Sequence, residues 1–428
     1  MKIVHGLNLG CYKERISHGN FICTPLILMK MILKNLILSL SLCCALYTGT
    51  AQTNDRGLYP DRITLTWSDQ PSTTQSVSWR INGSATKAVG QVVEEQSSPD
   101  LEKSAQTVLG VTSPLKIEGQ TADNYGQVSF QGLKPGTIYT YRVGDGTNWS
   151  AWNQFRTADV KGDFSFIYLG DAQNDLRSKW SRSIRKAFQQ EPNARFIVHA
   201  GDLINRSNND SEWGEWHEGA GFIHQMIPAG PTPGNHEYRR DSLEQLVLDP
   251  HWKKHFNLPK NGPKGMQDAV YYLDYQDVRM ISLNSQLIML DSIAAKKQEQ
   301  WLTEVLASSK AKWNIVVMHH PVYSTAKNRD NTILRERFRP IFEKYGVDLV
   351  LQGHDHTYAR GTAGKVRPVY LLSVAGPKMY GSDSERWMEV SGAQTQLYQV
   401  IRVTDSKLIF SSYKLNGQLF DSFELTHK

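Results

Sequence analysis

The chain has 428 residues, 40% hydrophobic and 21% charged, which is the composition of a globular protein large enough for two domains. Its formal net charge is +6, but the first 51 residues alone carry +4, and the remainder holds 43 basic against 41 acidic residues. Such a balance argues against nucleic acid or another polyanion as a partner.

The first 51 residues have the layout of an export signal. Lys30 and Lys34 precede an apolar run at 36–47, and small residues follow at 49–51. A basic region, about a dozen apolar residues and a small-residue exit predict a cleaved signal peptide. We therefore expect a secreted or periplasmic protein without stable membrane association after cleavage, and we exclude residues 1–51 from the fold.

Two alternatives remain for this segment. One is a retained membrane anchor, although the apolar run is short for a bilayer. The other is a lipoprotein signal at Cys43 or Cys44, which the large Leu42 fits poorly. Residues before about position 29 fit no signal design, which suggests Met29 or Met31 as the true start. All four cysteines lie in this segment, so the mature chain is expected to lack disulfides.

Residues 58–158 have the pattern of a small β-domain. Runs of alternating apolar and polar residues, separated by Asn-Gly, Pro-Gly and Asp-Gly turns, occur at 63–67, 76–81, 127–130 and 137–143. A hundred residues of this kind predict a β-sandwich, and residues 133–139 resemble the tyrosine corner of fibronectin type III domains. Trp149 and Trp152 are interpreted as core or interdomain packing rather than as a carbohydrate site.

Residues 163–428 alternate between buried-strand and helix patterns. Dense apolar runs occur at 164–169, 195–200, 278–283, 313–318, 347–351 and 369–374, and helical periodicity at 176–189, 298–307 and 332–345. This pattern predicts a layered α/β domain, in which ligands gather beyond the carboxyl ends of the strands.

Five short clusters of polar residues lie at those predicted strand ends. Their candidate metal ligands are Asp171, Asp202, Asn235, His319, His354 and His356. A mixture of carboxylate, amide and imidazole suits Mn, Fe or Zn, and a pair of such ions can clamp a phosphoryl group. Taken singly, each residue could be a helix cap, a turn residue or an exposed histidine. Five such coincidences in one order favour a metal site.

The other histidines of this region are given ordinary roles. His199 lies inside an apolar strand and is expected to be packed. The four at positions 217, 224, 251 and 255 are expected on surfaces or helices. His320 follows a candidate ligand and should point the opposite way along its strand, with a supporting or pocket role.

The clusters resemble those of the calcineurin-like metallophosphoesterase superfamily, and the order of a sandwich before the α/β domain is similar to its purple acid phosphatase branch. The residues that carry the resemblance are 77–80 (VSWR), 319–323 (HHPVY), 353–360 (GHDHTYAR) and 421–423 (DSF). The resemblance implies a dinuclear centre whose metal-bound hydroxide attacks phosphorus.

The same resemblance implies a role for each ligand. Asp202 would bridge two metals, the first held by Asp171 and His356 and the second by the ligands at positions 235, 319 and 354. His236 would contact the substrate as a catalytic residue, with Asp355 or Glu237 as candidates for tuning it as an acid.

The sequence departs from the purple enzymes at two positions. Asn205 stands where those enzymes carry the tyrosine responsible for their colour, and Gln173 stands where they usually have glycine. Either amide is a possible additional metal ligand. Loss of the phenolate predicts a colourless enzyme with two divalent ions, Fe, Mn or Zn.

The expected function is an acid-phosphatase-like phosphomonoesterase acting on a small phosphorylated substrate. A phosphodiesterase or nucleotidase is the alternative enzyme, and a non-catalytic glycan- or partner-binding protein with a degenerate metal site is the alternative of another class. Loops at 206–221 and 238–258 are predicted to form the substrate walls. Trp213 and Trp216 are expected to pack the first of these loops rather than to stack a nucleobase.

Overall fold

The computed structural model describes residues 59–81, 85–116, 123–382 and 385–427. The predicted signal peptide lies outside these residues. The described residues belong to one compact unit. Among them, no helix has both the length and the apolar character that a bilayer crossing requires.

The N-terminal part is a sandwich of two antiparallel four-stranded sheets. The first sheet has the order β1 (Asp61–Thr66), β2 (Gln75–Ile81), β6 (Asp123–Phe130), β5 (Val111–Leu115), and the second β4 (Gln106–Leu109), β3 (Val89–Glu94), β7 (Ile138–Gly144), β8 (Asn153–Arg156). Trp79, Phe130 and Tyr141 fill the core between the sheets. The Tyr139 hydroxyl accepts a hydrogen bond from the Lys134 N–H at 2.9 Å, as a tyrosine corner requires. The predicted sandwich is confirmed.

The polar face of the first sheet is also buried. Thr64, Thr66, Ser76 and Ser78 alternate with the apolar residues of β1 and β2, yet all four are fully buried. They lie against the C-terminal part of the chain, where the Thr66 hydroxyl donates to the Asn257 carbonyl at 2.8 Å. Alternation of polar and apolar residues normally indicates that one face of a sheet contacts solvent. In this sheet the polar face instead forms an interface with the C-terminal part of the chain.

Two tryptophans of the second sheet lie outside the core. Trp149 and Trp152 are only partly buried, and the Arg142 guanidinium lies 4.6 and 4.5 Å from their ring centroids. The prediction of core packing is therefore wrong for this pair, because a cation between the two indoles replaces apolar neighbours. Trp67, which follows β1, is instead fully buried against Phe196 and Tyr275 of the α/β part.

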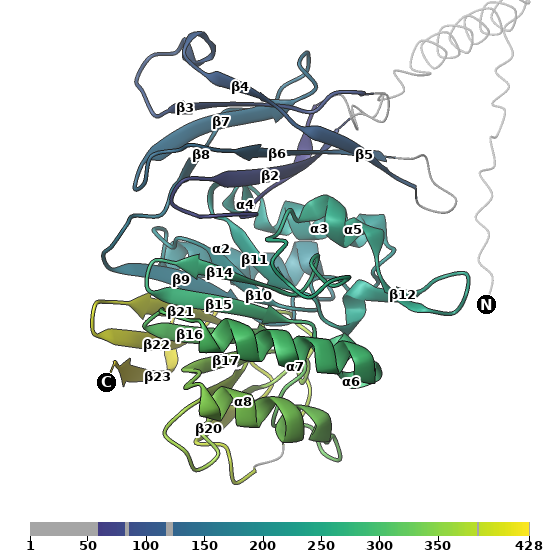
Figure 1. Cartoon of the computed structure of the whole chain (residues 1–428), viewed down its shortest axis with the longest axis vertical. Coiled ribbons are helices and arrows are strands. Elements are labelled where there is room, and N and C mark those ends of the chain that lie inside the picture. Colours follow the sequence, from purple (N-terminus) through teal and green to yellow (C-terminus); the bar gives the residue numbers. More distant parts are fainter. Residues whose placement is uncertain (1–58, 82–84, 117–122, 383–384, 428) are drawn as a thin grey trace, which may run out of the picture. The chain divides into compact units, whose positions relative to one another are not determined.

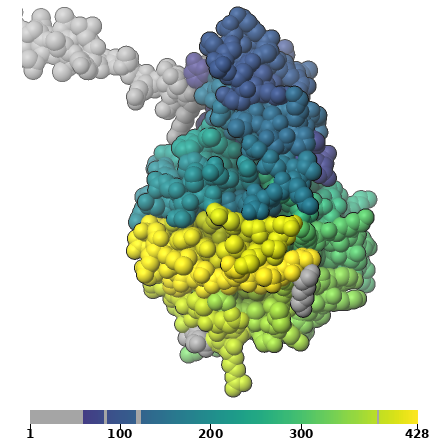
Figure 2. All heavy atoms as spheres, turned by 90° about the vertical axis from the view of Figure 1, so that its left-hand side faces the viewer, coloured from purple at the N-terminus to yellow at the C-terminus, as the bar shows by residue number. Residues whose placement is uncertain are grey.

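The C-terminal part contains two larger sheets packed face to face. The six-stranded sheet has the order β11 (Ala229–Thr232), β10 (Ile197–Ala200), β9 (Phe164–Leu169), β21 (Leu397–Val403), β22 (Lys407–Lys414), β23 (Leu419–Thr426). The seven-stranded sheet has the order β14 (Tyr271–Tyr275), β15 (Val278–Leu283), β16 (Trp313–Met318), β17 (Leu349–Gln352), β19 (Val369–Leu372), β18 (Tyr358–Gly361), β20 (Val390–Gly392). Strands β9 to β11 are mutually parallel, as are β15, β16, β17 and β19. Figure 2 shows the last strands of the chain, in yellow, together on one face.

Helices cover the outer faces of both sheets. On the six-stranded sheet lie the π-helical turn η2 (Leu176–Trp180), α2 (Ser181–Gln190) and α3 (Asp210–Ala220), and on the seven-stranded sheet α7 (Ser292–Ala307), η4 (Leu334–Phe338) and α8 (Arg339–Lys344) (Figure 1). Shorter elements are η1 (Leu101–Lys103), α4 (Ile223–Met226), η3 (Asn235–Glu237), β12 (Tyr238–Arg240), β13 (Leu246–Leu248), α5 (Pro250–His255) and α6 (Ser285–Leu290). The expected layered α/β domain, a β-sandwich flanked by helices, is confirmed.

Local sequence accounts well for the central strands and less well for the helix ends. The strands predicted at 164–169, 278–283 and 313–318 have these bounds in the structure. The helix predicted at 298–307 begins earlier, at Ser292, because the Asp291 carboxylate caps the N–H groups of residues 293 and 294. The predicted loop at 206–221 is largely helix α3, which Asn209 caps.

Candidate metal centre

The candidate ligands meet where strands of the two sheets end. Asp171 and Asp202 follow β9 and β10 of the six-stranded sheet, and Asn235 follows its edge strand β11. His319 follows β16, and His354 follows β17, both in the seven-stranded sheet. Parallel neighbouring strands end at the same edge, so residues far apart in the sequence converge there.

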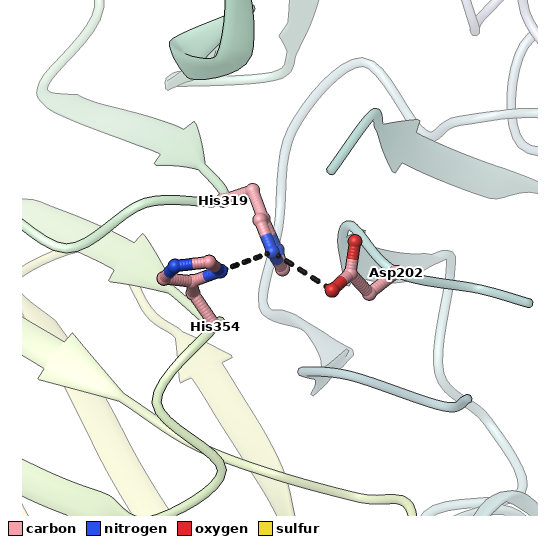
Figure 3. Close-up of side chains that lie close together, drawn as sticks. All are labelled: Asp202, His319 and His354. Atoms are coloured by element: carbon pink, nitrogen blue, oxygen red, sulfur yellow. Dashed lines mark hydrogen bonds and ion pairs between the residues drawn. The ribbon is translucent and has the colours of Figure 1, made fainter. Parts of the chain in front are cut away.

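One group of ligand atoms surrounds His319 (Figure 3). Its Nε2 lies 3.1 Å from Asp202 Oδ2, 3.1 Å from His354 Nδ1 and 3.2 Å from Asn235 Oδ1. Separations of roughly 3 Å are those expected between ligands that share one ion at about 2.0–2.2 Å. The donors predicted for the second metal are therefore together.

A second group of ligand atoms also includes Asp202. Single ligand atoms of Asp171, Asp202 and His356 lie within 4.8 Å of one another. His356 Nε2 is 3.6 Å from Asp171 Oδ1, and the Gln173 amide nitrogen lies 2.9 Å from Asp202 Oδ2 and 3.1 Å from His356 Nε2. Asp202 is common to both groups, which is the arrangement expected of a bridging carboxylate.

Main-chain hydrogen bonds set the tautomers of two histidines. His319 Nδ1 lies 2.9 Å from the Ala200 carbonyl, and His356 Nδ1 lies 2.8 Å from the Lys378 carbonyl. Because a carbonyl only accepts, both Nδ1 atoms carry hydrogen, and Nε2 is the ring nitrogen of each histidine that faces the ligand groups. Metal-binding histidines are oriented in this way by their outer partners.

The backbone of the ligands is strained. Asp171, Asp202, His354 and His356 have φ values of 26°, 51°, 77° and 52°, a region that disfavours side chains. Gly201, with φ 86°, has no room for a side chain, because a Cβ there would lie 2.6 Å from His319 Nδ1. Strain concentrated at side chains that converge is a mark of a functional site.

The charges of the site call for a cation. Burial disfavours the imidazolium of His319, but the carboxylates of Asp202 and Asp171 outweigh it and raise the pKa of His319 to about 10. Burial also raises the pKa of the Asp171 carboxyl well above its ordinary value. The raised pKa of His319 means that the negative charge of the site is balanced by a positive charge, and a bound metal ion can supply that charge instead of a proton. The donor set, its spacing and its charge thus fit a pair of metal ions.

Glu237 organises the site, a role that the sequence analysis did not assign. Its carboxylate is fully buried and accepts from the N–H groups of Asp202 at 3.0 Å, Leu203 at 2.7 Å and Gly234 at 2.6 Å. Burial and the nearby Asp202 raise the pKa of Glu237 to about 7. The only sequence signal was an acid directly after the Asn-His pair. Glu237 ties the loop bearing Asp202 to the turn bearing Asn235.

His236 lies beside the bridging carboxylate. Its N–H donates to Asp202 Oδ1 at 2.9 Å, its Nδ1 lies 2.6 Å from the Asn205 carbonyl, and its Nε2 lies 3.9 Å from Asp202 Oδ2. Neither carboxylate suggested as a tuning partner contacts its ring. Glu237 bonds the three N–H groups above, and Asp355 accepts from Ser324, Thr325 and Arg329. A main-chain carbonyl, rather than an acid, orients His236.

The two additional amides differ in position. Gln173 is fully buried within the Asp171 group. Asn205 acts through its main chain, since its carbonyl accepts from His236 and its N–H donates to Glu212 at 2.8 Å. Its side chain makes no hydrogen bond to any residue that the structure describes.

The segments predicted as substrate walls combine buried and exposed residues. Trp213 and Trp216 are fully buried, which confirms their packing role. The histidines at 217, 224, 251 and 255 all lie on helices, one of the two expected positions, but none is a surface residue, because their exposed fractions are 8%, 1%, 1% and 1%. They lie among these tryptophans and the polar face of the first sheet.

His199 is packed, as expected, with its Nε2 3.3 Å from His224 Nε2. His320 contacts His354, with ring centroids 4.2 Å apart.

Comparison with known proteins assigns both parts of the chain. Residues 164–358 match the family model "Calcineurin-like phosphoesterase", and residues 60–157 match "Purple acid Phosphatase, N-terminal domain". A double α/β sandwich with carboxylate, amide and imidazole groups at its strand ends defines a metallophosphoesterase fold. The chain belongs to the calcineurin-like metallophosphoesterase superfamily, in its purple acid phosphatase-like branch.

The curated proteins similar to this chain include several that are named as phosphatases. The chain is 25% identical over 262 residues to the "Probable purple acid phosphatase 20" of Arabidopsis thaliana, a match that covers 58% of this chain and 60% of the relative. It is 24% identical over 277 residues to the "Acid phosphatase type 7" of Homo sapiens, covering 58% of each chain. The chain thus spans less than two thirds of the length of these relatives.

Among solved structures, the purple acid phosphatase PPD1 of yellow lupin seeds (Lupinus luteus) superposes with a TM-score of 0.73 at 17% identity, covering 86% of this chain and 74% of that one. A structure of PhoD superposes with a TM-score of 0.65 at 13% identity, covering 86% and 91%. At these identities the superpositions establish the shared fold.

Proposed function

We propose that the chain is a metal-dependent phosphoric ester hydrolase, acting on small phosphomonoesters with a dinuclear metal centre. The observation that carries this proposal is the sharing of Asp202 between two groups of ligand atoms. One carboxylate between two such groups is suited to a pair of ions about 3.5–4 Å apart.

The proposal assigns each ligand to an ion. Asp171 and His356, with Asp202, would hold the first ion, and Asn235, His319 and His354, again with Asp202, the second. When bound, the ions would lower the pKa of a water molecule and offset the charge of the phosphoryl oxygens.

His236 is the proposed catalytic residue. Its Nδ1–H is held on the Asn205 carbonyl, so Nε2 is the free ring nitrogen and lies near Asp202 Oδ2. From there the neutral ring accepts a hydrogen bond from substrate, whereas the imidazolium stabilises a phosphoryl oxygen or protonates the leaving group. While Nδ1–H stays on the Asn205 carbonyl, only the charged form of the ring donates from Nε2.

The first metal site is proposed to take a divalent ion. With asparagine at position 205, no phenolate is available three residues after the bridging Asp202. Gln173 adjoins this site through its amide nitrogen and brings no negative charge to it. Fewer negative ligands weaken the preference for a trivalent ion, which supports two divalent ions, Fe, Mn or Zn.

An activity assay with defined metals tests the proposal. The purified full chain would be given p-nitrophenyl phosphate or bis(p-nitrophenyl) phosphate, with Mn, Zn, Fe or no metal, beside an Asp202→Asn variant. We expect metal-dependent turnover that is faster for the monoester, is lost in the variant and accompanies two bound ions per chain. Absence of turnover with every metal would favour the non-catalytic binding protein, and faster turnover of the diester would favour the phosphodiesterase.

The signal-like segment supports a secreted or periplasmic location, which we also propose. Detection of the protein in culture medium or periplasmic extract, with a new N-terminus near position 52, would test it.

A further inference from the structure

The loop after β19 is fastened to the metal-ligand loops. The N–H groups of Ala375 and Gly376 donate to the carbonyls of Gly170 and Asp171 at 2.9 and 2.7 Å. A Cβ at position 376 would lie 2.5 Å from the Asp171 carbonyl oxygen, so only glycine allows this approach. Two residues later, the Lys378 carbonyl accepts from His356 Nδ1. Lys378 is therefore presented at the site by a loop in a fixed position.

The side chain of Lys378 faces the first ligand group. Its Nζ lies 3.4 Å from Gln173 Oε1, and the amide nitrogen of Gln173 in turn contacts Asp202 and His356. On its other side the Nζ lies 5.5 Å from the ring centroid of Tyr380, which packs on the His356 ring with centroids 4.7 Å apart. The ammonium group is thus one amide away from the proposed bridging carboxylate.

No described carboxylate offsets the charge of Lys378. Among the described carboxylates, none lies within ion-pair distance of its Nζ, and its side chain is half-buried. Arg329, another cation near the ligands, pairs with the fully buried Asp355. An unpaired, partly desolvated ammonium beside an anion-binding centre is suited to an anionic ligand.

We propose that Lys378 binds the phosphate group of the substrate and gives the site its preference for a dianionic monoester over a monoanionic diester. This inference rests on the proposed function and names the residue that sets its substrate class. A monoester carries nearly two negative charges at neutral pH, and a diester carries one. Loss of a cation should therefore weaken transition-state binding of the monoester more than that of the diester.

The test compares Lys378→Met and Lys378→Arg with wild type in the full chain. Lys186→Met, on the exposed face of α2, serves as a matched control. We expect Lys378→Met to lower kcat/KM for p-nitrophenyl phosphate by roughly 10- to 100-fold, the effect of one charge-assisted hydrogen bond. For bis(p-nitrophenyl) phosphate the loss should be at most roughly threefold, because the interaction scales with charge. Lys378→Arg should restore most of the monoester activity.

Two further measurements separate substrate binding from a structural role. Metal content of all variants should equal that of wild type, and the inhibition constant of inorganic phosphate should rise only in Lys378→Met. Equal losses on both esters, or a loss of metal, would overturn the inference and leave Lys378 as a support of the loop.

Binding of phosphate by Lys378 can also be tested separately from the proposed hydrolase activity. If wild type with its metals hydrolyses neither ester, the proposed function fails. Calorimetry with inorganic phosphate then tests Lys378 directly: binding that is lost in Lys378→Met and kept in Lys378→Arg supports the inference, and any other pattern overturns it.

Discussion

Glu237 offers a sharp test of how the metal centre is held together. Its carboxylate accepts three main-chain N–H groups, two from the loop of Asp202 and one from Gly234, in the turn that bears Asn235. Glu237→Ala leaves these three buried donors without partners, at about 1–3 kcal/mol for each. Some relaxation around the cavity is expected, so we predict a loss of about 3–6 kcal/mol in the free energy of unfolding.

Glu237→Gln is the milder and more informative change. Glutamine keeps the shape of the side chain, but its NH2 group cannot accept a hydrogen bond. It must therefore face at least one N–H group that donates to the Glu237 carboxylate in wild type. The best amide orientation leaves Leu203 unpaired, because Oε2 serves two donors and Oε1 one. We expect a loss of about 1–3 kcal/mol and weaker binding of metal by about 10- to 100-fold, as for other residues that orient ligands.

Urea denaturation and metal-binding isotherms would measure both effects. Glu244→Gln is the matched control, since its side chain is 82% exposed and its replacement should change stability by less than about 0.5 kcal/mol. The reasoning is refuted if Glu237→Gln unfolds like this control and binds both ions as tightly as wild type.

Three further predictions concern charge and colour. Burial lowers the pKa of His199 to about 3, so its neutral form stabilises the fold fully above about pH 6.5, and this contribution is lost as the pH falls toward 3. When the pH is lowered from 7.5 to 4.5, the free energy of unfolding of wild type, measured by urea denaturation, should therefore fall by roughly 2 kcal/mol more than that of His199→Gln. Equal decreases in the two proteins would contradict this prediction. Burial opposes the charge of Asp210, but hydrogen bonds from His251 and Arg62 hold the pKa of Asp210 well below 3.8. Its contribution is fully present above about pH 4 and declines as the pH falls toward the lowered folded pKa, so Asp210→Asn should lower the unfolding midpoint more at pH 7 than at pH 2.5. With asparagine at position 205, the purified, oxidised enzyme should be colourless, and a band in the middle of the visible spectrum would refute the proposed divalent centre.

Four residues of the site could be named from the sequence because each lies within two residues of the end of an apolar strand, namely Asp171, Asp202, His319 and His354. The runs before Asp171 and His319 are fixed by local hydrophobicity alone, and a ligand that follows such a run has little choice of position. The parallel arrangement of the strands then brings the ligands to one edge. For this reason the candidate ligands could be proposed, and the layered fold predicted, from the sequence.

The supporting contacts were not accessible, because they join residues that no local pattern relates. Lys378 meets Gln173 across 205 positions, and Glu237 accepts from main-chain groups 34 and 35 positions away. The burial of the histidines around Trp216 was not accessible either. Helical periodicity in the sequence does not show which other elements pack over a helix.

The amino-acid sequence by itself determined which side chains can bind metal and the order in which they occur, since strand patterning and ligand chemistry are properties of short segments. Only the tertiary structure decided which groups orient those ligands, which polar faces are buried and which cation lies beside the ligands without a carboxylate partner among the described residues. Hydrogen bonding and charge compensation depend on distance in space, and distances between remote segments are set by packing of the whole chain.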